Sequence, residues 1–260
     1  MPHQRRAVDL PIPGALAQSG DLACVRLGRV GKRRDSREQI EAKIVDLGRR
    51  QLLERGAAGL SLRAIARDLD MVSSAVYRYV ASRDELLTRL LVDADSDLAD
   101  TVERARDDTL ADSWSDDVIA IAHAARGWAV AHPASWTLLY GGRVPGYRAP
   151  PNRTVEVGTR VIGTFFDAIA AGIATGDIRL TNDVAPQPMS SDFERIRQKY
   201  GFPGDDRVVT KCLLLWAGVV GAISLEVFGQ YGTDTVTDPA VIFDAQIRLL
   251  VDVLTLHTNC

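Results

Sequence analysis

Hydroxyl, phenol and guanidinium side chains are concentrated between residues 61 and 79 of this 260-residue chain. Small polar, phenolic and basic groups of this kind hydrogen-bond to phosphate oxygens and to the edges of DNA bases. The alternative is that Tyr77 and Tyr79 are ordinary half-buried tyrosines whose hydroxyls face water. The candidate contact residues are Ser61, Arg63, Ser73, Ser74, Ala75, Tyr77, Arg78 and Tyr79.

The spacing of apolar residues predicts two short helices, joined by a tight turn, that carry these side chains. Ser61 is a suitable N-cap, because its hydroxyl can accept a hydrogen bond from an amide of the first helical turn. Asp70 stands where the chain must turn, and aspartate tolerates a left-handed backbone better than most residues. Ser73 or Ser74 then starts the second helix. The first helix buries one face, made by Leu62, Ile65, Ala66 and Leu69.

Two further predicted helices flank this pair. Residues 37–54 carry an apolar stripe, and Gly56 follows them as a good helix terminator. Ser82 and Glu85 form a capping box that opens a long helix over residues 84–110. The predicted order is therefore one helix, the short pair, and a long helix that leads away from it.

Three helices and the start of a fourth, in this order, resemble the DNA-binding domain of the TetR family. The most specific part is residues 77–87, YRYVASRDELL, which is similar to the family's run of Tyr-x-Tyr/His-Phe-x-Ser-Lys/Arg-x-x-Leu-Leu. Asp70 stands where the family often has glycine, and Val80 where it often has phenylalanine. The resemblance covers residues 37 to about 95 and implies a helix-turn-helix DNA-binding domain over residues 37–97.

The same resemblance implies a role for each candidate contact residue. Residues 73–75 are expected to face bases from the N-terminus of the recognition helix, and Arg78 to meet either bases or phosphates. Phosphate contacts are expected from Ser61, Arg63, Tyr77 and Tyr79.

Charge is distributed unevenly along the chain, although the net formal charge is only −3. Residues 1–36 hold seven basic and three acidic residues (+4), residues 37–92 ten and eight (+2), and residues 93–260 fourteen and twenty-three (−9). A basic face attracts a polyanion and an acidic body repels it, which helps to orient a protein on DNA. Residues 1–36 lack clear periodicity and are interpreted as a flexible basic arm, which either adds DNA contacts or is a solvated tail.

Residues 98–260 show a second and looser resemblance, to the effector domain of the TetR subgroup named for Trp, His and Gly. Trp128, His132 and Gly141 are the matching positions. His132 either hydrogen-bonds a ligand or caps a helix end, and the capping role is favoured. Aromatic stripes are likewise more often core than pocket. An apolar or aromatic ligand is expected, and the candidate pocket residues are Trp128, His132, Trp136, Tyr140, Phe165, Phe166 and Trp216.

The remaining periodic segments predict helices over residues 118–131, 155–174, 193–200, 208–228 and 239–256, with Ser115 as the cap of the first. No segment alternates as a strand would. The expected fold is therefore all-α, with the N-terminal three-helix DNA-binding domain followed by a larger helical ligand-binding and dimerisation domain. The last two helices are the expected homodimer interface, where Gly218 and Gly221 permit close approach. The alternative is that residues 208–228 are buried within one subunit.

The TetR resemblance implies a repressor whose paired recognition helices read successive major grooves of a palindromic operator. A bound effector would favour a spacing of these helices that no longer fits the operator. Activation of transcription is the alternative outcome.

Other classes of protein find little support in the sequence. Cys24, Cys212 and Cys260 lie far apart and form neither a disulfide framework nor a metal-binding spacing. No nucleophile elbow, phosphate-binding loop or cofactor motif is recognised, so neither an enzyme nor a cofactor is expected. No secretory signal and no sufficiently long apolar run are recognised, which predicts a cytoplasmic protein. An enzyme and a helical dimer that does not bind DNA are the competing hypotheses.

Overall fold

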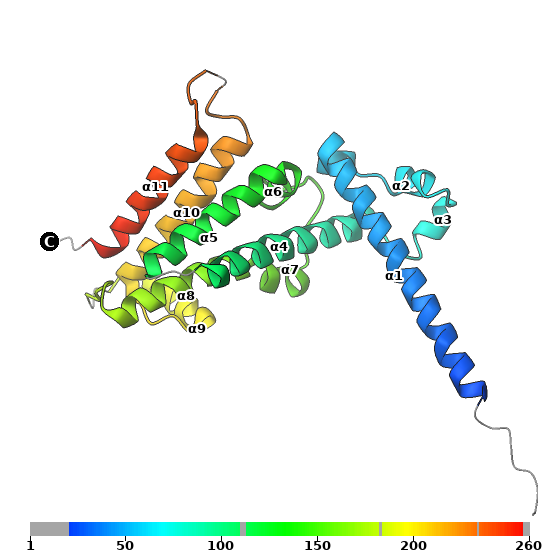
Figure 1. Cartoon of the computed structure of the whole chain (residues 1–260), viewed down its shortest axis with the longest axis horizontal. Helices are drawn as coiled ribbons and strands as arrows, with labels where there is room; N and C mark the ends of the chain where they lie inside the picture. The colour runs from blue at the N-terminus through cyan, green and yellow to red at the C-terminus, as the bar shows by residue number, and fades with distance from the viewer. Residues whose placement is uncertain (1–20, 110–112, 182–183, 233, 257–260) are drawn as a thin grey trace, which may run out of the picture. The chain divides into compact units, whose positions relative to one another are not determined.

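The computed structural model describes residues 21–109, 113–181, 184–232 and 234–256, with the backbone alone for residues 21–36. Every regular element in these ranges is a helix, so the predicted all-α fold is confirmed (Figure 1). Two compact units are distinguished, residues 1–43 and 44–260. The predicted domain limit at residue 97 falls inside a continuous helix and stays a prediction.

The helices are, in chain order, α1 (Asp21–Arg55), the 3-10 turn η1 (Ala57–Gly59), α2 (Leu62–Asp68), α3 (Ser73–Val76), α4 (Arg83–Asp108), α5 (Trp114–Ala131), α6 (Pro133–Tyr140), α7 (Pro151–Gly158), α8 (Arg160–Thr175), α9 (Met189–Tyr200), α10 (Asp206–Val227) and α11 (Pro239–Thr255).

Helix α1 begins at Asp21, well before the predicted start at Arg37. The predicted flexible arm is therefore helical over residues 21–36, and residues 1–20 lie outside the described part of the chain. Arginine, lysine and leucine in this stretch favour helix, and it contains no proline. The prediction relied on apolar periodicity, which reports packing against a partner rather than helicity alone. The helix ends at Arg55 because Gly56 adopts a positive φ of 66°.

The turn between α2 and α3 confirms the local predictions. The Ser61 hydroxyl accepts from the Ala64 amide at 3.3 Å and caps α2. Asp70 has a positive φ of 52°, and the Met71 amide donates to the Ala66 carbonyl across it at 2.9 Å. This backbone pattern is a Schellman motif, which ends a helix sharply. The chain therefore turns directly into α3, which starts at Ser73 as expected.

Caps also define the two long helices that follow. Ser82 accepts from the Glu85 amide at 3.1 Å and starts α4, as the capping box predicts. The predicted cap of α5, Ser115, is wrong, because Ser113 accepts from the Asp116 amide at 3.3 Å instead. Ser115 is the second residue of the helix, and its hydroxyl lies 2.7 Å from that of Ser113.

The segment predicted as one helix over residues 155–174 consists of two helices, α7 and α8, which meet at Thr159. The Thr159 hydroxyl donates to the carbonyls of Val155 and Glu156, at 2.8 and 3.1 Å. A side-chain bond of this kind competes with the helical ladder and favours a break. Apolar periodicity runs through the break, so the sequence pattern does not reveal it.

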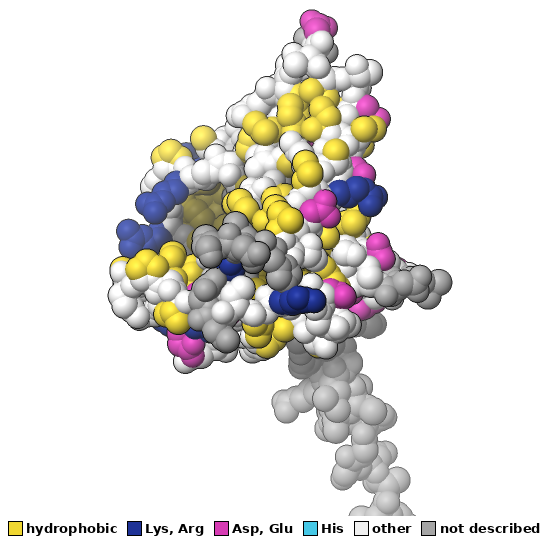
Figure 2. All heavy atoms as spheres, turned by 90° about the vertical axis from the view of Figure 1, so that its left-hand side faces the viewer, with side chains coloured by type: hydrophobic (Ala, Val, Ile, Leu, Met, Phe, Trp, Pro, Cys, Tyr) yellow, Lys and Arg dark blue, Asp and Glu magenta, His cyan; other side chains and the backbone are white. Residues whose placement is uncertain are grey.

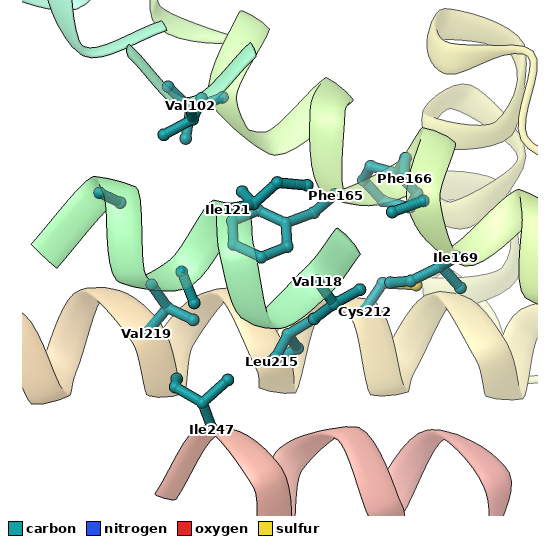
Figure 3. Packing of buried hydrophobic residues seen from close by; sticks show 14 of the residues in the cluster. Val102, Val118, Ile121, Phe165, Phe166, Ile169, Cys212, Leu215, Val219 and Ile247 are labelled. Atoms are coloured by element: carbon teal, nitrogen blue, oxygen red, sulfur yellow. The ribbon is translucent and has the colours of Figure 1, made fainter. Parts of the chain in front are cut away.

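The core of the larger part lies where α5, α8, α10 and α11 meet. Figure 3 shows Val118 and Ile121 of α5 pointing toward Phe165 of α8 and Leu215 of α10, with Ile247 of α11 beyond. Cys212 is buried in this cluster, which confirms its prediction as a small core residue. Apolar burial of this extent fixes the frame on which the candidate sites stand.

Candidate nucleic-acid interface and effector cavity

The predicted DNA-contact residues occupy the first turn of α2, the whole of α3 and the turn after it. Ser61 and Tyr79 are half-buried, as is Ala75. Tyr77 is 46% exposed, which leaves its hydroxyl free to meet a phosphate. The exposed members of the set are Arg63, Ser73, Ser74, Tyr77 and Arg78. Hydroxyl, phenol and guanidinium groups therefore emerge from a single local substructure.

Apolar residues beneath this surface hold the short helices in place. Ile65 and Val76 are fully buried, one from each helix of the pair, and Val80 is fully buried after them. Gly48 of α1 lets α4 approach closely, because a β-carbon there would lie 3.2 Å from the Leu90 side chain. A four-residue helix such as α3 has no stability of its own, so its position depends on this packing.

Gln51 is a supporting residue that the sequence analysis does not identify. Its side chain is buried, and its carbonyl oxygen accepts from the Ser61 amide at 2.9 Å. The start of α2 is therefore held both by its own cap and by a residue of α1. A polar residue between apolar ones on a helical stripe is the one sequence signal that could have indicated this role.

A chain of charged contacts joins the end of α3 to α7. Arg89 of α4 donates to the Tyr79 carbonyl at 2.8 Å and to the Glu85 carboxylate at 2.9 Å. Arg153 of α7 donates to the other oxygen of Glu85 at 2.6 Å. Burial tends to raise the pKa of Glu85, but the Arg153 and Arg89 guanidinium groups outweigh it and hold this pKa below its usual range. Glu85 is thus ionised at neutral pH and bridges the two arginines.

A cavity of about 1170 Å³ lies beside α4, under the loop between α6 and α7. The Tyr147 hydroxyl in this loop is 2.9 Å from the Thr88 hydroxyl of α4. The wall combines Leu91 of α4 with residues 138–140 of α6 and residues 142–149 of the loop. The cavity and the charged chain therefore share the same two N-terminal turns of α4.

The predicted pocket aromatics divide between this cavity and the core. Tyr140 lines the cavity, and its ring centroid lies 4.2 Å from that of Trp136 and 6.1 Å from that of Trp216. Phe165 contacts Trp216 in turn, with ring centroids 6.1 Å apart. These four rings form a continuous path inward from the cavity wall. Phe166 lies apart from it and packs on Tyr200 and Phe202.

Trp128 and His132 lie at the end of α5 and hold one another. The Trp128 indole nitrogen donates to an Asp97 carboxylate oxygen at 2.7 Å. His132 Nδ1 is 2.9 Å from the Trp128 carbonyl, and the two rings are 5.0 Å apart. The His132 carbonyl also accepts from the Trp136 amide at 2.9 Å, so this residue joins the end of α5 to the start of α6. This geometry suits the helix-capping role.

Helices α10 and α11 present large apolar side chains to solvent. Figure 2 shows hydrophobic side chains gathered on the side of the molecule where α11 lies in Figure 1. Leu249 is 65% exposed, a large fraction for a helical leucine. We call this surface the α10–α11 face; its exposed residues are Leu214, Ala217, Leu225 and Phe228 of α10, and Val241, Ala245, Leu249 and Leu256 of α11.

The two glycines of α10 have different surroundings. A β-carbon at Gly218 would lie 2.5 Å from a Leu250 methyl group, so this glycine serves the packing of α10 on α11 within one subunit. At Gly221 a β-carbon would meet nothing within 4 Å. Gly221 therefore leaves space on the α10–α11 face itself. Both hypotheses made for this helix describe part of it.

A short helix pair carrying polar and basic groups, joined to a helical body with a cavity, defines a helix-turn-helix transcriptional regulator. Residues 44–90 match the family model described as bacterial regulatory proteins, tetR family. Residues 118–250 match the model described as tetracyclin repressor-like, C-terminal domain. The chain belongs to the tetR family of bacterial regulatory proteins, and it is a regulator rather than an enzyme.

Relatives of this chain support the same assignment. HTH-type transcriptional regulators of Mycobacterium tuberculosis and Mycobacterium bovis are 82% identical over 229 residues, which cover 88% of this chain and 98% of each relative. The crystal structure of the regulatory protein SCO4313 is 32% identical, with a TM-score of 0.69, over 84% of this chain and 98% of that one.

A more distant solved structure shares the fold alone. The transcriptional regulator FadR from Bacillus subtilis in complex with stearoyl-CoA is 11% identical, with a TM-score of 0.58, over 83% of this chain and 99% of that one. The closer assignment to the subgroup named for Trp, His and Gly stays a prediction.

Proposed function

We propose that the protein is a homodimeric repressor that binds a palindromic operator and is released by an apolar or aromatic small molecule. Residues 61–79 of each protomer supply the DNA contacts, with residues 73–75 directed at bases. The cavity beside α4 receives the effector. The protein acts in the cytoplasm, where its operator lies.

The α10–α11 face is the observation that carries this proposal. One recognition helix reads only a few base pairs, too few to specify a site. Two copies paired through an apolar face present two such helices, related by a two-fold axis. An exposed leucine and valine stripe costs solubility in a monomer, and burial against a second copy removes that cost.

Coupling between effector and operator is proposed to pass through the first turns of α4. The loop that covers the cavity is tied to Thr88 through Tyr147. Helix α7, which follows this loop, is tied to Glu85 through Arg153, and Glu85 orients Arg89 on the Tyr79 carbonyl. An effector that shifts the loop therefore shifts the end of the recognition helix. Effector and operator then weaken each other's binding reciprocally.

The decisive experiment is footprinting of the purified protein on the DNA immediately upstream of its own gene, because regulators of this family often control their own transcription. The assay is run over a salt series, with an unrelated duplex as control. A protected palindromic site and a steep decrease of affinity with salt support the proposal. Absence of binding to every duplex at low salt would overturn it and favour the helical dimer that does not bind DNA.

Tyr77→Phe is expected to weaken binding to all operator variants by a similar factor, about threefold to tenfold. The phenol is exposed and is assigned to a phosphate, which carries no sequence information. Affinities for a panel of single-base operator variants check this. Ser73→Ala is the comparison, because a base contact predicts losses that differ from one variant to another. Unequal losses for Tyr77→Phe would refute its positioning role.

Arg89→Ala is expected to lower operator affinity about tenfold without changing the salt slope. Arg89 is assigned to the Tyr79 carbonyl and Glu85 rather than to phosphate, so its loss loosens the recognition helix but releases no additional counterion. Arg78→Ala is the contrasting variant, for which the slope falls by about one. Arg104→Ala, exposed on the same helix, is the control. A reduced slope for Arg89→Ala would show that Arg89 itself meets DNA.

A further inference from the structure

Helix α4 carries several carboxylates along its middle, and one of them differs from its neighbours. Asp93 accepts from Arg49 Nε at 2.9 Å, Asp97 from the Trp128 indole at 2.7 Å, and Asp100 from Arg160 at 2.7 Å. Asp95 is only 8% exposed, so it is the most buried of the four. Within the described ranges, no donor lies within hydrogen-bonding distance of its carboxylate, and no cation compensates its charge.

The position of Asp95 relates it to the cavity beside α4. It follows Leu91 by one helical turn, and Leu91 lines the cavity. Tyr140 of α6 lines the same cavity, and after burial, which is the larger cause, the Asp95 charge raises the pKa of its phenol. On the other side, a β-carbon at Gly158 of α7 would lie 3.2 Å from the Asp95 carboxylate. The carboxylate therefore lies at the inner end of the cavity, directly behind Leu91 and Tyr140.

A buried and uncompensated carboxylate is costly, and charged groups in protein interiors are normally paired. Replacing the Asp95 charge by a neutral side chain of the same shape would remove this cost, so a partner absent from the isolated chain offers a physical reason for it. The aromatic path that starts at Tyr140 lies next to the carboxylate. Aromatic faces and a carboxylate together stabilise an organic cation.

We propose that the effector is an organic cation, an aromatic or apolar molecule with a positively charged nitrogen, whose charge is neutralised by Asp95. This inference rests on the proposed effector response and specifies its chemistry. The apolar part of the ligand lies along Leu91, residues 138–140 and the loop. The charged nitrogen lies between Asp95 and the Tyr140 ring.

Two other occupants fit the surroundings less well. A divalent metal ion requires several oxygen or nitrogen ligands, and no group of three or more such side chains is found among the residues that the structure describes. An anion would be attracted by Arg143 and Arg148 at the open rim of the cavity. Both arginines are exposed, so solvent screens them, whereas the charge of Asp95 is screened little.

The test is equilibrium binding of three fluorescent probes to the full-length protein without DNA. Ethidium is the cation, N-phenyl-1-naphthylamine the neutral probe, and 8-anilinonaphthalene-1-sulfonate its anionic relative. Wild-type protein is expected to bind ethidium at least tenfold more tightly than either other probe. Asp95→Asn is expected to reduce ethidium affinity at least tenfold and to leave the neutral probe within about twofold. Asp100→Asn, the same substitution at an exposed position of α4, is expected to change none of the three.

Preferential binding of the anionic probe would show that the rim arginines dominate and would overturn the proposal. Equal losses of all three probes in Asp95→Asn would also overturn it, since that pattern indicates a structural role. Because the assay contains no DNA, these outcomes are independent of operator binding. Failure of the footprinting experiment with intact ethidium selectivity would refute the proposed repressor and leave the cation site standing.

Discussion

Replacing Leu249 with glutamate is expected to convert the protein to a monomer and to lower operator affinity on the order of 100-fold or more. Leu249 is 65% exposed on α11, in the middle of the α10–α11 face. A glutamate there places a charge opposite its own copy across the two-fold axis, without partner or solvent. A monomer binds each half-site separately and loses the effective concentration that links the two recognition helices. Sedimentation equilibrium and operator titration measure the two effects.

Val155→Glu is the matched control for this variant. Val155 is also a largely exposed aliphatic residue on a helix, but it belongs to α7 and lies outside the α10–α11 face. It is expected to leave the molecular mass in solution and the operator affinity unchanged. A dimer that persists in Leu249→Glu would exclude this face as the interface. Monomers that retain full operator affinity would instead exclude dimerisation as the source of affinity.

Local sequence signals predict the DNA-binding part of the fold well, because each depends on a nearby partner. Ser61 and Ser82 act as caps within three residues of themselves, and the Asp70 turn is closed by a bond between Met71 and Ala66. Their chemistry is contained in a short segment. The break at Thr159 is also local, but the apolar stripe conceals it, since the stripe continues on both sides.

The candidate effector site is only partly predictable from the sequence, because its members come from distant segments. Aromatic composition identifies Tyr140 and Trp216 but does not separate a cavity wall from the core behind it. Asp95 is one of several acids on a charged helix, and only the packing of α6 and α7 against α4 reveals that it is buried and unpaired. The Arg153 contact with Glu85 spans 68 residues and has no local signature.

Asp95→Asn is expected to stabilise the ligand-free protein by about 2 kcal/mol at pH 8, in contrast to most substitutions of buried polar residues. Burial raises the pKa of Asp95 to about 6, from the usual value near 4. The ionised form is therefore disfavoured in the folded state, and above pH 6 the carboxylate destabilises the fold. The asparagine is neutral at every pH and carries no such cost. The unfolding midpoint at pH 8 is expected to rise by about 5 °C.

The pH dependence supplies the sharper part of this test. Because the pKa is higher in the folded state, the folded protein binds a proton more tightly, and wild type gains stability relative to Asp95→Asn as the pH falls from 6 to 4. Below about pH 4 the two proteins should be equally stable. Tyr140, the titratable group that faces Asp95, stays neutral over this range, because burial and the Asp95 charge raise its pKa. Thermal unfolding of both proteins between pH 4 and pH 8 measures the difference. A variant less stable than wild type at pH 8 would mean that Asp95 is paired in the free protein, and the argument for a cationic effector would lose its basis.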